Sequence, residues 1–235
     1  MKILKFDELD STNNYMKEYI SAFNNYDIIS AKNQTSGRGR RGNTWLSSEG
    51  MALFSFLLKP NKKMNIKDYT KIPLIAGIAT LSALKKIEKN DYKFKWTNDI
   101  YLNNKKLSGI LVEKVENNFI VGIGINVNNE ISKELKEIAI SLNGKYDIDK
   151  VILAVVEEFS KYYEKFISGN WLELLKEIND HNFLKNKEIM IKIGEASYSG
   201  KALNIAEDGR LEIEIDNQIK YFSAGEIKIE KGFNR

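Results

Sequence analysis

Three of the chain's five arginines fall within one short segment, Gly37-Arg38-Gly39-Arg40-Arg41-Gly42. Nearly all of the other basic residues are lysines. A guanidinium differs from an ammonium in its planar fork, which can bind two oxygens of a carboxylate or phosphate together. The interleaved glycines let the backbone approach a ligand closely. The segment therefore predicts an anion-binding loop that is mobile when empty and closes over its ligand.

Two other interpretations of this segment stay open at this point. It also fits a solvated basic loop, or an Arg-Gly segment that grips nucleic-acid phosphates and binds RNA or DNA with a steep salt dependence. Gln34 precedes the segment and Trp45 follows it closely. An aromatic ring so near could stack on a planar group, which favours a small ligand.

The composition narrows the chemistry further. Cysteine is absent, so disulfides, thiol nucleophiles and thiolate metal sites are excluded. His181 is the one histidine, which disfavours a Ser-His-Asp or zinc hydrolase. Phosphoryl and nucleotidyl transfer remain, because they work mainly by placing positive charge around a phosphate-bearing reactant. The net charge of +4 suits anionic ligands but does not itself indicate nucleic-acid binding.

A second polar segment, Lys95-Trp96-Thr97-Asn98-Asp99, is followed by Lys106 and Gly109. Asn98 and Asp99 could simply begin a turn, and Lys106 could be an exposed hairpin lysine.

Apolar and small or polar residues alternate from Val121 to Asn128. The alternation predicts a strand with its valines and isoleucines toward a core and Gly122, Gly124 and Asn126 on the other face. Two glycines there would leave a flat floor for a ring or backbone, or would serve close strand–helix packing. The spacing is not that of a dinucleotide-binding fingerprint.

Ser11-Thr12-Asn13 precedes a predicted helix, which Ser11 could cap. A helix start also offers free backbone N–H groups to a polar ligand.

Taken in the order in which they occur along the chain, these segments resemble the motifs of biotin protein ligases. Gln34 to Gly42 with Trp45 is similar to the family's biotin-binding loop, although Asn43 stands where many members carry another arginine. Lys95 to Asp99 with Lys106 resembles its Lys-Trp-Pro-Asn-Asp stretch and active-site lysine, with Thr97 in place of proline. Gly122 to Asn126 resembles its Gly-x-Gly-Ile-Asn strand, and Ser11-Thr12-Asn13 its Ser-Thr-Asn triplet.

The resemblance implies activation of biotin by ATP to biotinyl-adenylate, followed by transfer of biotin to a lysine of an acceptor. It implies three catalytic residues, Lys106, Arg38 and Asp99. The implied biotin contacts are Ser11, Thr12, Asn13, Gln34, Gly37, Arg38, Gly39, Arg40, Lys106 and Gly109. The implied ATP contacts are Arg38, Arg40, Trp45, Asn98, Lys106 and Asn126. Mg²⁺ would be carried on the triphosphate, since we see no dedicated carboxylate cage and expect no metal ligands from the protein.

The implied partner is a biotin carboxyl carrier protein, a subunit of acetyl-CoA carboxylase. We expect a cytoplasmic protein with no membrane segment. We also expect no specific DNA binding, because the chain starts directly at the catalytic region and leaves no room for the N-terminal helix-turn-helix domain of some members. Exposed strand edges allow a homodimer. A related lipoate ligase is the nearest alternative, but its Arg-Gly-Gly loop pattern is not found.

The elements that must position these residues form an α+β pattern. Strands are expected at 3–6, 27–32, 51–58, 92–96, 101–102, 106–116 and 119–128. Helices are expected at 12–21, 73–87, 149–167 and 171–179, and a functional loop at 33–48. Pro73 suits the first turn of its helix, and Asn103-Asn104 suits a hairpin turn.

After about residue 185 short alternating strands follow one another, at 188–193, 198–205, 211–215, 219–222 and 227–230. We therefore predict a catalytic domain over 1–184, with a mixed β-sheet and flanking helices of the class II synthetase-like, biotin–lipoate ligase kind. A small C-terminal β-barrel over 185–235 would follow it.

Overall fold

A seven-stranded mixed sheet forms the centre of the protein in this computed structural model, which describes residues 1–61 and 64–229. The strand order is β1-β2-β3-β7-β6-β5-β4; β1 and β2 are parallel and the other neighbours antiparallel. The strands are β1 (Ile3–Leu9), β2 (Ile28–Gln34), β3 (Met51–Leu58), β4 (Lys93–Lys95), β5 (Asp99–Leu102), β6 (Lys105–Val115) and β7 (Asn118–Asn126). The predicted mixed sheet is confirmed.

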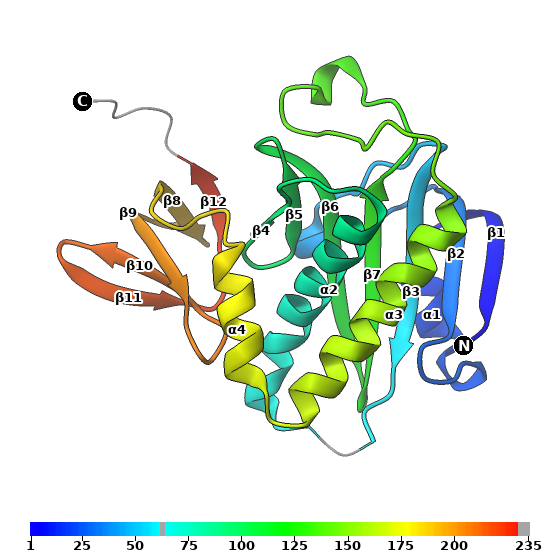
Figure 1. Cartoon of the computed structure of the whole chain (residues 1–235), viewed down its shortest axis with the longest axis horizontal. Helices are drawn as coiled ribbons and strands as arrows, with labels where there is room; N and C mark the ends of the chain where they lie inside the picture. Colours follow the sequence, from blue (N-terminus) through cyan, green and yellow to red (C-terminus); the bar gives the residue numbers. More distant parts are fainter. Residues whose placement is uncertain (62–63, 230–235) are drawn as a thin grey trace.

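Helices cover both faces of this sheet (Figure 1). Helices α2 (Ile72–Ile87) and α3 (Ile148–Ile167) pack on one face over the main core. Helix α1 (Thr12–Glu18) lies on the other, above a small separate cluster that includes Met16 and Leu57. Helix α4 (Trp171–Asp180) leads to the C-terminal strands. Short 3-10 turns are η1 (Ile20–Ala22), η2 (Arg40–Gly42), η3 (Ile66–Lys71) and η4 (Lys133–Leu135). The site described below lies on the α1 side.

The structure confirms some of the predicted turns and helix boundaries and differs from others. Pro73 lies in the first turn of α2, and Asn103 and Asn104 form the β5–β6 turn with φ of 51° and 61°, as predicted. The helix predicted over 12–21 ends earlier, at Glu18, and η1 follows it. Ser11 takes the N-cap position, as predicted, but its side chain makes no capping hydrogen bond. The amide of Thr12, the first residue of the helix, donates to Gln34 Oε1 at 2.7 Å.

The C-terminal strands form a second, wholly antiparallel sheet of five strands in the order β11-β10-β9-β8-β12. They are β8 (Glu188–Ile193), β9 (Ala196–Ile205), β10 (Leu211–Ile215), β11 (Gln218–Phe222) and β12 (Glu226–Ile229). The predicted barrel-type module is confirmed; residue 230, which the prediction gave to the last strand, lies outside the described residues. The division at residues 184 and 185 stays a prediction.

The two sheets share one hydrophobic core, in which Ile189 and Ile213 of the module join residues of α2 and α4. Indole N–H groups add polar ties: Trp96 Nε1 donates to Gly209 O at 3.0 Å, and Trp171 Nε1 to Glu207 O at 2.6 Å. These contacts hold the loop between β9 and β10 against the β4–β5 turn of the first sheet and against α4. Within the described part of the chain, no helix is long and apolar enough to cross a membrane.

Helices α2 and α3 are joined behind the site by the buried carboxylate of Glu158. Its oxygens lie 2.7 Å from Lys86 Nζ and 2.8 Å from Lys161 Nζ, and Ser82 Oγ donates to it at 3.0 Å. Burial alone would raise the pKa of Glu158, but these hydrogen bonds and charges hold it at about 2. An ionised carboxylate with several partners therefore fixes the two helices together.

We predict that Glu158→Gln lowers the free energy of unfolding by about 1–2 kcal/mol at pH 7, because it weakens the charge-assisted hydrogen bonds from Lys86 and Lys161, whose own side chains are largely exposed. The folded-state pKa lies below the ordinary value of 4.5, so this contribution is present above pH 4.5 and is lost as the pH falls toward about 2. Urea denaturation across this range measures it, with the exposed neighbour Glu157→Gln as the control. An equal, pH-independent effect in both variants would contradict the prediction.

Candidate active site

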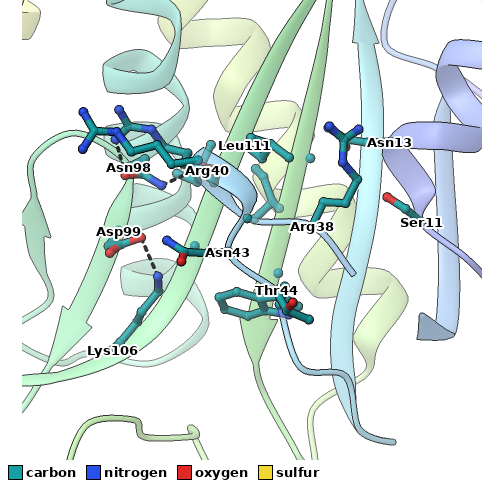
Figure 2. A pocket seen from close by; sticks show the side chains of 18 of the residues that line it. Ser11, Asn13, Arg38, Arg40, Asn43, Thr44, Asn98, Asp99, Lys106 and Leu111 are labelled. Carbon is teal, nitrogen blue, oxygen red and sulfur yellow. Dashed lines mark hydrogen bonds and ion pairs between the residues drawn. The ribbon is translucent and has the colours of Figure 1, made fainter. Parts of the chain in front are cut away.

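A cavity of about 320 Å³ gathers the predicted site residues. Its walls come from the start of α1, the arginine loop after β2, strands β6 and β7, and the β4–β5 turn. Every predicted site residue lines it except Gly37 and Asn126. Figure 2 shows Arg38 and Arg40 pointing toward opposite ends, Arg38 toward Asn13 and Arg40 toward Asn98. The sequence motifs therefore converge on one space, although they lie up to about 100 residues apart.

One end of the cavity is a buried polar network around the Ser-Thr-Asn triplet. Thr12 Oγ1 lies 3.1 Å from Gln34 Oε1, and Ser55 Oγ lies 2.7 Å from Thr12 Oγ1 and 2.6 Å from Asn13 Oδ1. Asn13 Nδ2 donates to Glu113 Oε2 at 2.8 Å. Buried polar groups with this many partners are held in fixed orientations. This end can therefore present fixed donors and acceptors to a polar ring.

Glu113 connects that network to the arginine loop. The Nη1 of Arg38 lies 3.0 Å from Glu113 Oε1 and donates to Asn14 Oδ1 at 2.9 Å. Sequence reasoning missed Glu113, Ser55 and Asn14. Alternation along β6 places Glu113 on the face of Gly109, which was the available signal, but nothing nearby in the sequence marks its partners.

Arg40 occupies the other end, bound only by neutral groups. Its Nη1 donates to Thr97 Oγ1 and, at 2.9 Å, to Asn98 Oδ1. Asn98 Nδ2 donates in turn to Ile110 O at 2.8 Å, and the Trp96–Thr97 peptide bond is cis. Burial lowers the pKa of the Arg40 guanidinium. The β4–β5 turn thus orients this cation through the side chains of Thr97 and Asn98.

Lys106 and Asp99 form an ion pair at the rim, with Nζ 2.8 Å from Asp99 Oδ1 (Figure 2). The lysine's backbone is held as well: its N–H donates to Ile138 O at 2.8 Å, and its carbonyl accepts from Ile140 N at 3.0 Å. Ile138 and Ile140 belong to the long connection between β7 and α3. The backbone of Lys106 and its ammonium group are therefore both held in place.

Lys95 is a further cation in the cavity that the sequence analysis did not assign. It lies directly opposite Asp99 in the β4–β5 pairing, a register that the short turn could have suggested. Its Nζ donates to Tyr101 Oη at 3.2 Å and lies 3.5 Å from Ile227 O. Burial lowers the pKa of Lys95, against the attraction of Asp99.

The C-terminal module supplies part of the wall. Gly225, Glu226 and Ile227, at the start of β12, line the cavity together with the motifs of the first sheet. No local pattern in the sequence assigned them, because their place depends on how the module packs. The cavity therefore lies between the two sheets, not within the first alone.

The glycine floor predicted on β7 exists, but side chains of the chain itself cover it. A Cβ at Gly124 would lie 2.5 Å from Trp45 Cε2, and one at Gly109 would lie 2.7 Å from Trp45 Cζ3. The space beside Gly122 holds the amide of Asn13. The indole of Trp45, not a vacant surface, therefore lies on the floor, and a bound molecule would pack beside this ring.

Gly37 and Asn126 have structural contacts instead of lining the cavity. Gly37 O accepts from Trp45 N at 2.9 Å, which shapes the arginine loop. Asn126 is buried and its Oδ1 accepts from Asn129 Nδ2 at 3.1 Å. His181 is also absent from the lining; its Nε2 lies 3.1 Å from Lys85 Nζ.

Chemically, five cations surround a space with few carboxylates: Arg38, Arg40, Arg41, Lys95 and Lys106 line it, against Asp99 and Glu226. Such a cavity stabilises a reactant that carries or develops negative charge. Among residues 1–61 and 64–229, no group of three or more His, Cys, Asp or Glu side chains could hold a metal ion.

We predict that Gly124→Ala lowers the free energy of unfolding by about 1–3 kcal/mol, because the new methyl group must displace the Trp45 ring. In a Trp45→Ala background the same change should cost little. Urea denaturation of the four proteins of this double-mutant cycle measures the coupling. An equal cost of Gly124→Ala in both backgrounds would show that the ring does not occupy this floor.

Comparison with known proteins agrees with this arrangement. The chain is 33% identical to a biotin protein ligase from Aquifex aeolicus in complex with biotin and ATP, covering 98% of this chain and 99% of that one with a TM-score of 0.88. It is 29% identical to the bifunctional ligase/repressor BirA of Bacillus subtilis over 86% of this chain, and it spans 66% of the length of that relative. A biotin–[acetyl-CoA-carboxylase] ligase of Mycobacterium tuberculosis is 23% identical over 85% of this chain and 77% of its own length.

Two family models divide the sequence between them. Residues 186–229 match the biotin protein ligase C terminal domain, a small SH3-like barrel-type fold. This match favours the biotin ligase interpretation over a lipoate ligase or an Arg-Gly nucleic-acid binder. Residues 5–129, more than half of the 235, match the Biotin/lipoate A/B protein ligase family, and the chain belongs to that family.

Proposed function

We propose that this chain is a biotin protein ligase that activates biotin with ATP and transfers it to a lysine of a biotin carboxyl carrier protein. The observation that carries the proposal is the single cavity in which the arginine loop, Lys106 and the buried Ser-Thr-Asn network meet. The Aquifex aeolicus structure, which has the same fold at 33% identity, was determined with biotin and ATP. The cavity has a polar end and a cationic end, as this pair of substrates requires.

The polar end would bind the biotin ring system. The ureido group carries donors and acceptors, and a buried ureido group left without partners would be costly. Ser11, Thr12 and Asn13, oriented by Gln34, can supply both kinds of group from the start of α1. The biotin side chain would then extend along Trp45 and Gly109 toward Lys106.

The cationic end would hold the reacting groups. A carboxylate oxygen of biotin attacks the α-phosphorus of ATP, the bond to the bridging oxygen breaks, and pyrophosphate leaves. Lys106 would neutralise the charge between the carboxylate and the α-phosphate, and Asp99 would orient its ammonium. Arg38 would exchange Glu113 for oxygens of the adenylate when the loop closes. Asn98 orients Arg40 toward the nucleotide.

In the second half-reaction the neutral amine of an acceptor lysine attacks the acyl carbon. The bond to the phosphate oxygen breaks, and AMP and one proton are released as the amide forms. The closed loop would keep water from the anhydride until the acceptor arrives. The acceptor is proposed to be the carrier subunit of acetyl-CoA carboxylase, in the cytoplasm. A homodimer could form through the outer edge of β1, which ends the order of the described strands.

Mg²⁺ is proposed to enter with the triphosphate. The carboxylates that line the cavity, Asp99 and Glu226, do not form a cage with a third acidic residue in the described chain. Mg²⁺ usually keeps several waters and binds substrate phosphates, so this donor set is consistent with a metal held mainly by ATP.

We predict that Lys106→Ala reduces biotin-dependent ATP–pyrophosphate exchange by roughly 10²–10³-fold, because it removes a preorganised cation from the reacting carboxylate and phosphate. Lys105→Ala is the matched control, since Lys105 is the neighbouring lysine, lies outside the lining of the cavity, and donates from Nζ to the backbone carbonyl of Lys136. Circular dichroism should show both variants folded. Equal exchange rates in the two variants would remove Lys106 from the mechanism, and exchange driven by lipoate in place of biotin would contradict the proposed substrate.

Arg38→Ala is predicted to weaken biotin binding and to release biotinyl-adenylate about 10- to 100-fold faster, since each charge-assisted hydrogen bond contributes roughly 1.5–3 kcal/mol. Calorimetric titration with biotin, and the dissociation of labelled adenylate, measure the two effects. Glu113→Gln separates loop tethering from ligand contact, because it frees Arg38 without removing it. Retention of the adenylate at the wild-type rate in Arg38→Ala would refute the role.

A further inference from the structure

The long connection between β7 and α3, at the top of the view in Figure 1, takes the place of a strand beside Lys106. Antiparallel pairing of β6 with β7 begins at Ser108 and Ile125. Continued by two residues, this register would put Val127 beside Lys106. Ala139 of the connection lies there instead, in a parallel bridge, and the two backbone hydrogen bonds of Lys106 described above join it to the residues on either side of Ala139. On this side the connection, not β7, therefore holds the backbone of Lys106.

The same stretch of the connection, residues 138–143, is also bound to the end of β7. Leu142 N–H donates to Asn126 O at 3.2 Å, and Asn143 N–H donates to Val127 O at 2.9 Å. The first half of segment 138–143 thus bonds to the start of β6, and the second half bonds to the end of β7. A shift of this segment relative to β7 would carry the backbone partners of Lys106 with it.

Two buried polar side chains that the proposed mechanism does not use, Asn129 and Ser141, hold this segment in place. Ser141 Oγ donates to Val127 O at 2.8 Å and lies 3.5 Å from Asn129 Oδ1. Asn129 Nδ2 donates to Asn126 Oδ1 at 3.1 Å. The exposed fractions are 9% for Ser141 and 4% for Asn129. Because a buried polar group that loses its partner costs free energy, these hydrogen bonds favour one position of the segment over shifted ones.

The base of the connection is closed as well. Asn128 Nδ2 donates to Tyr146 O at 2.8 Å, and Asn128 Oδ1 accepts from Tyr146 N at 3.0 Å. The Tyr146 hydroxyl donates to Glu88, which follows α2, and this hydrogen bond raises the pKa of Tyr146 to about 12. The connection is therefore anchored to the fold at its base, and segment 138–143 is held between that anchor and Lys106.

We propose that Asn129 and Ser141 are positioning residues that set the place of Lys106 through segment 138–143. The proposal rests on the proposed function, in which Lys106 neutralises charge between the carboxylate of biotin and the α-phosphate. Neither side chain lines the cavity, so both act through Lys106 and not by touching a substrate. Asp99 holds the ammonium group at one end of the lysine, and the segment holds its backbone at the other. A misplacement of about 1 Å can cost roughly 10²-fold in rate, so both ends need support.

The kinetic test separates positioning from ligand contact. Ser141→Ala and Asn129→Ala should each lower the kcat of biotin-dependent pyrophosphate exchange about 10-fold and change the KM values for ATP and biotin by less than about 2-fold. Ser141→Thr keeps the hydroxyl group and should recover most of the rate. Ser132→Ala is the matched control, since Ser132 is an exposed serine of the same connection, and it should change nothing. A higher KM for ATP with an unchanged kcat would show a nucleotide contact and overturn the proposal.

A second comparison repeats Ser141→Ala in a Lys106→Ala background. Because the proposed effect acts through the ammonium group of Lys106, Ser141→Ala should lower the rate of adenylate formation there by less than about 2-fold. A single turnover with ATP labelled at the α-phosphate measures this rate even when it is slow. The same loss in both backgrounds would show a general structural effect and refute the role.

Hydrogen exchange of the empty protein tests the structural step without any activity. The amide of Lys106, which donates to Ile138 O, should exchange about 10-fold faster in Ser141→Ala than in the wild type. The amide of Ile110, which donates to Asn98 O, should keep its rate. An unchanged rate at Lys106 would overturn the proposal even if kcat falls. If Ser141→Ala does not fold, Asn129→Ala carries the same three measurements.

The outcomes separate this proposal from the proposed function. If wild-type pyrophosphate exchange depends on biotin but the amide of Lys106 is unaffected by both substitutions, the positioning role fails and the ligase assignment stands. If pyrophosphate exchange does not depend on biotin, the ligase assignment fails, and faster hydrogen exchange at Lys106 would still show that Asn129 and Ser141 hold its backbone.

Discussion

The site depends on holding several cations close together in a partly buried space before any anion is bound. Neighbouring cations repel each other, and each loses hydration when it is partly buried, so the fold must supply acidic or hydrogen-bonding partners for them. Asp99 serves Lys106 at 2.8 Å and Glu113 serves Arg38 at 3.0 Å. Both acids are temporary partners in the proposed reaction, because substrate oxygens can replace them. Arg40 and Lys95 are held by neutral oxygens instead, and they would gain the most from a bound phosphate.

The surroundings of these cations are rigid because three separate parts of the chain meet there. The glycines of β6 and β7 let the Trp45 ring lie flat on the sheet, which fixes the return of the arginine loop. The connection from β7 to α3 pairs with the backbone of Lys106. The module reaches the site through the Trp96–Gly209 hydrogen bond and the start of β12. Each part buries a different side of the same charged space, so none of them positions the cations alone.

Local patterns in the sequence were enough for most of the fold and for the main motifs. The periodicity of α3, the alternation of β7 and the Asn103-Asn104 turn depend on residues close in the chain, and the structure agrees with them. The predicted capping hydrogen bond of Ser11 does not form, and the first amide of the helix, on Thr12, donates to Gln34 of β2, a long-range contact that no local pattern predicts. Glu113, Ser55 and Glu226 escaped prediction since their roles arise from strand pairing and module packing, which join residues about 40 to 210 positions apart. The glycines of β7 predicted a space, but only tertiary structure decides which ring fills it.

The docked module completes the wall of the charged space. Gly225, Glu226 and Ile227 line it together with the arginine loop and Lys106. The proposed reaction must stabilise negative charge that develops at the α-phosphorus, and cations held in place in a partly buried space do this better than the same groups in water. Because the shared core and the Trp96 indole hold the module in place, its docking is part of what encloses the site.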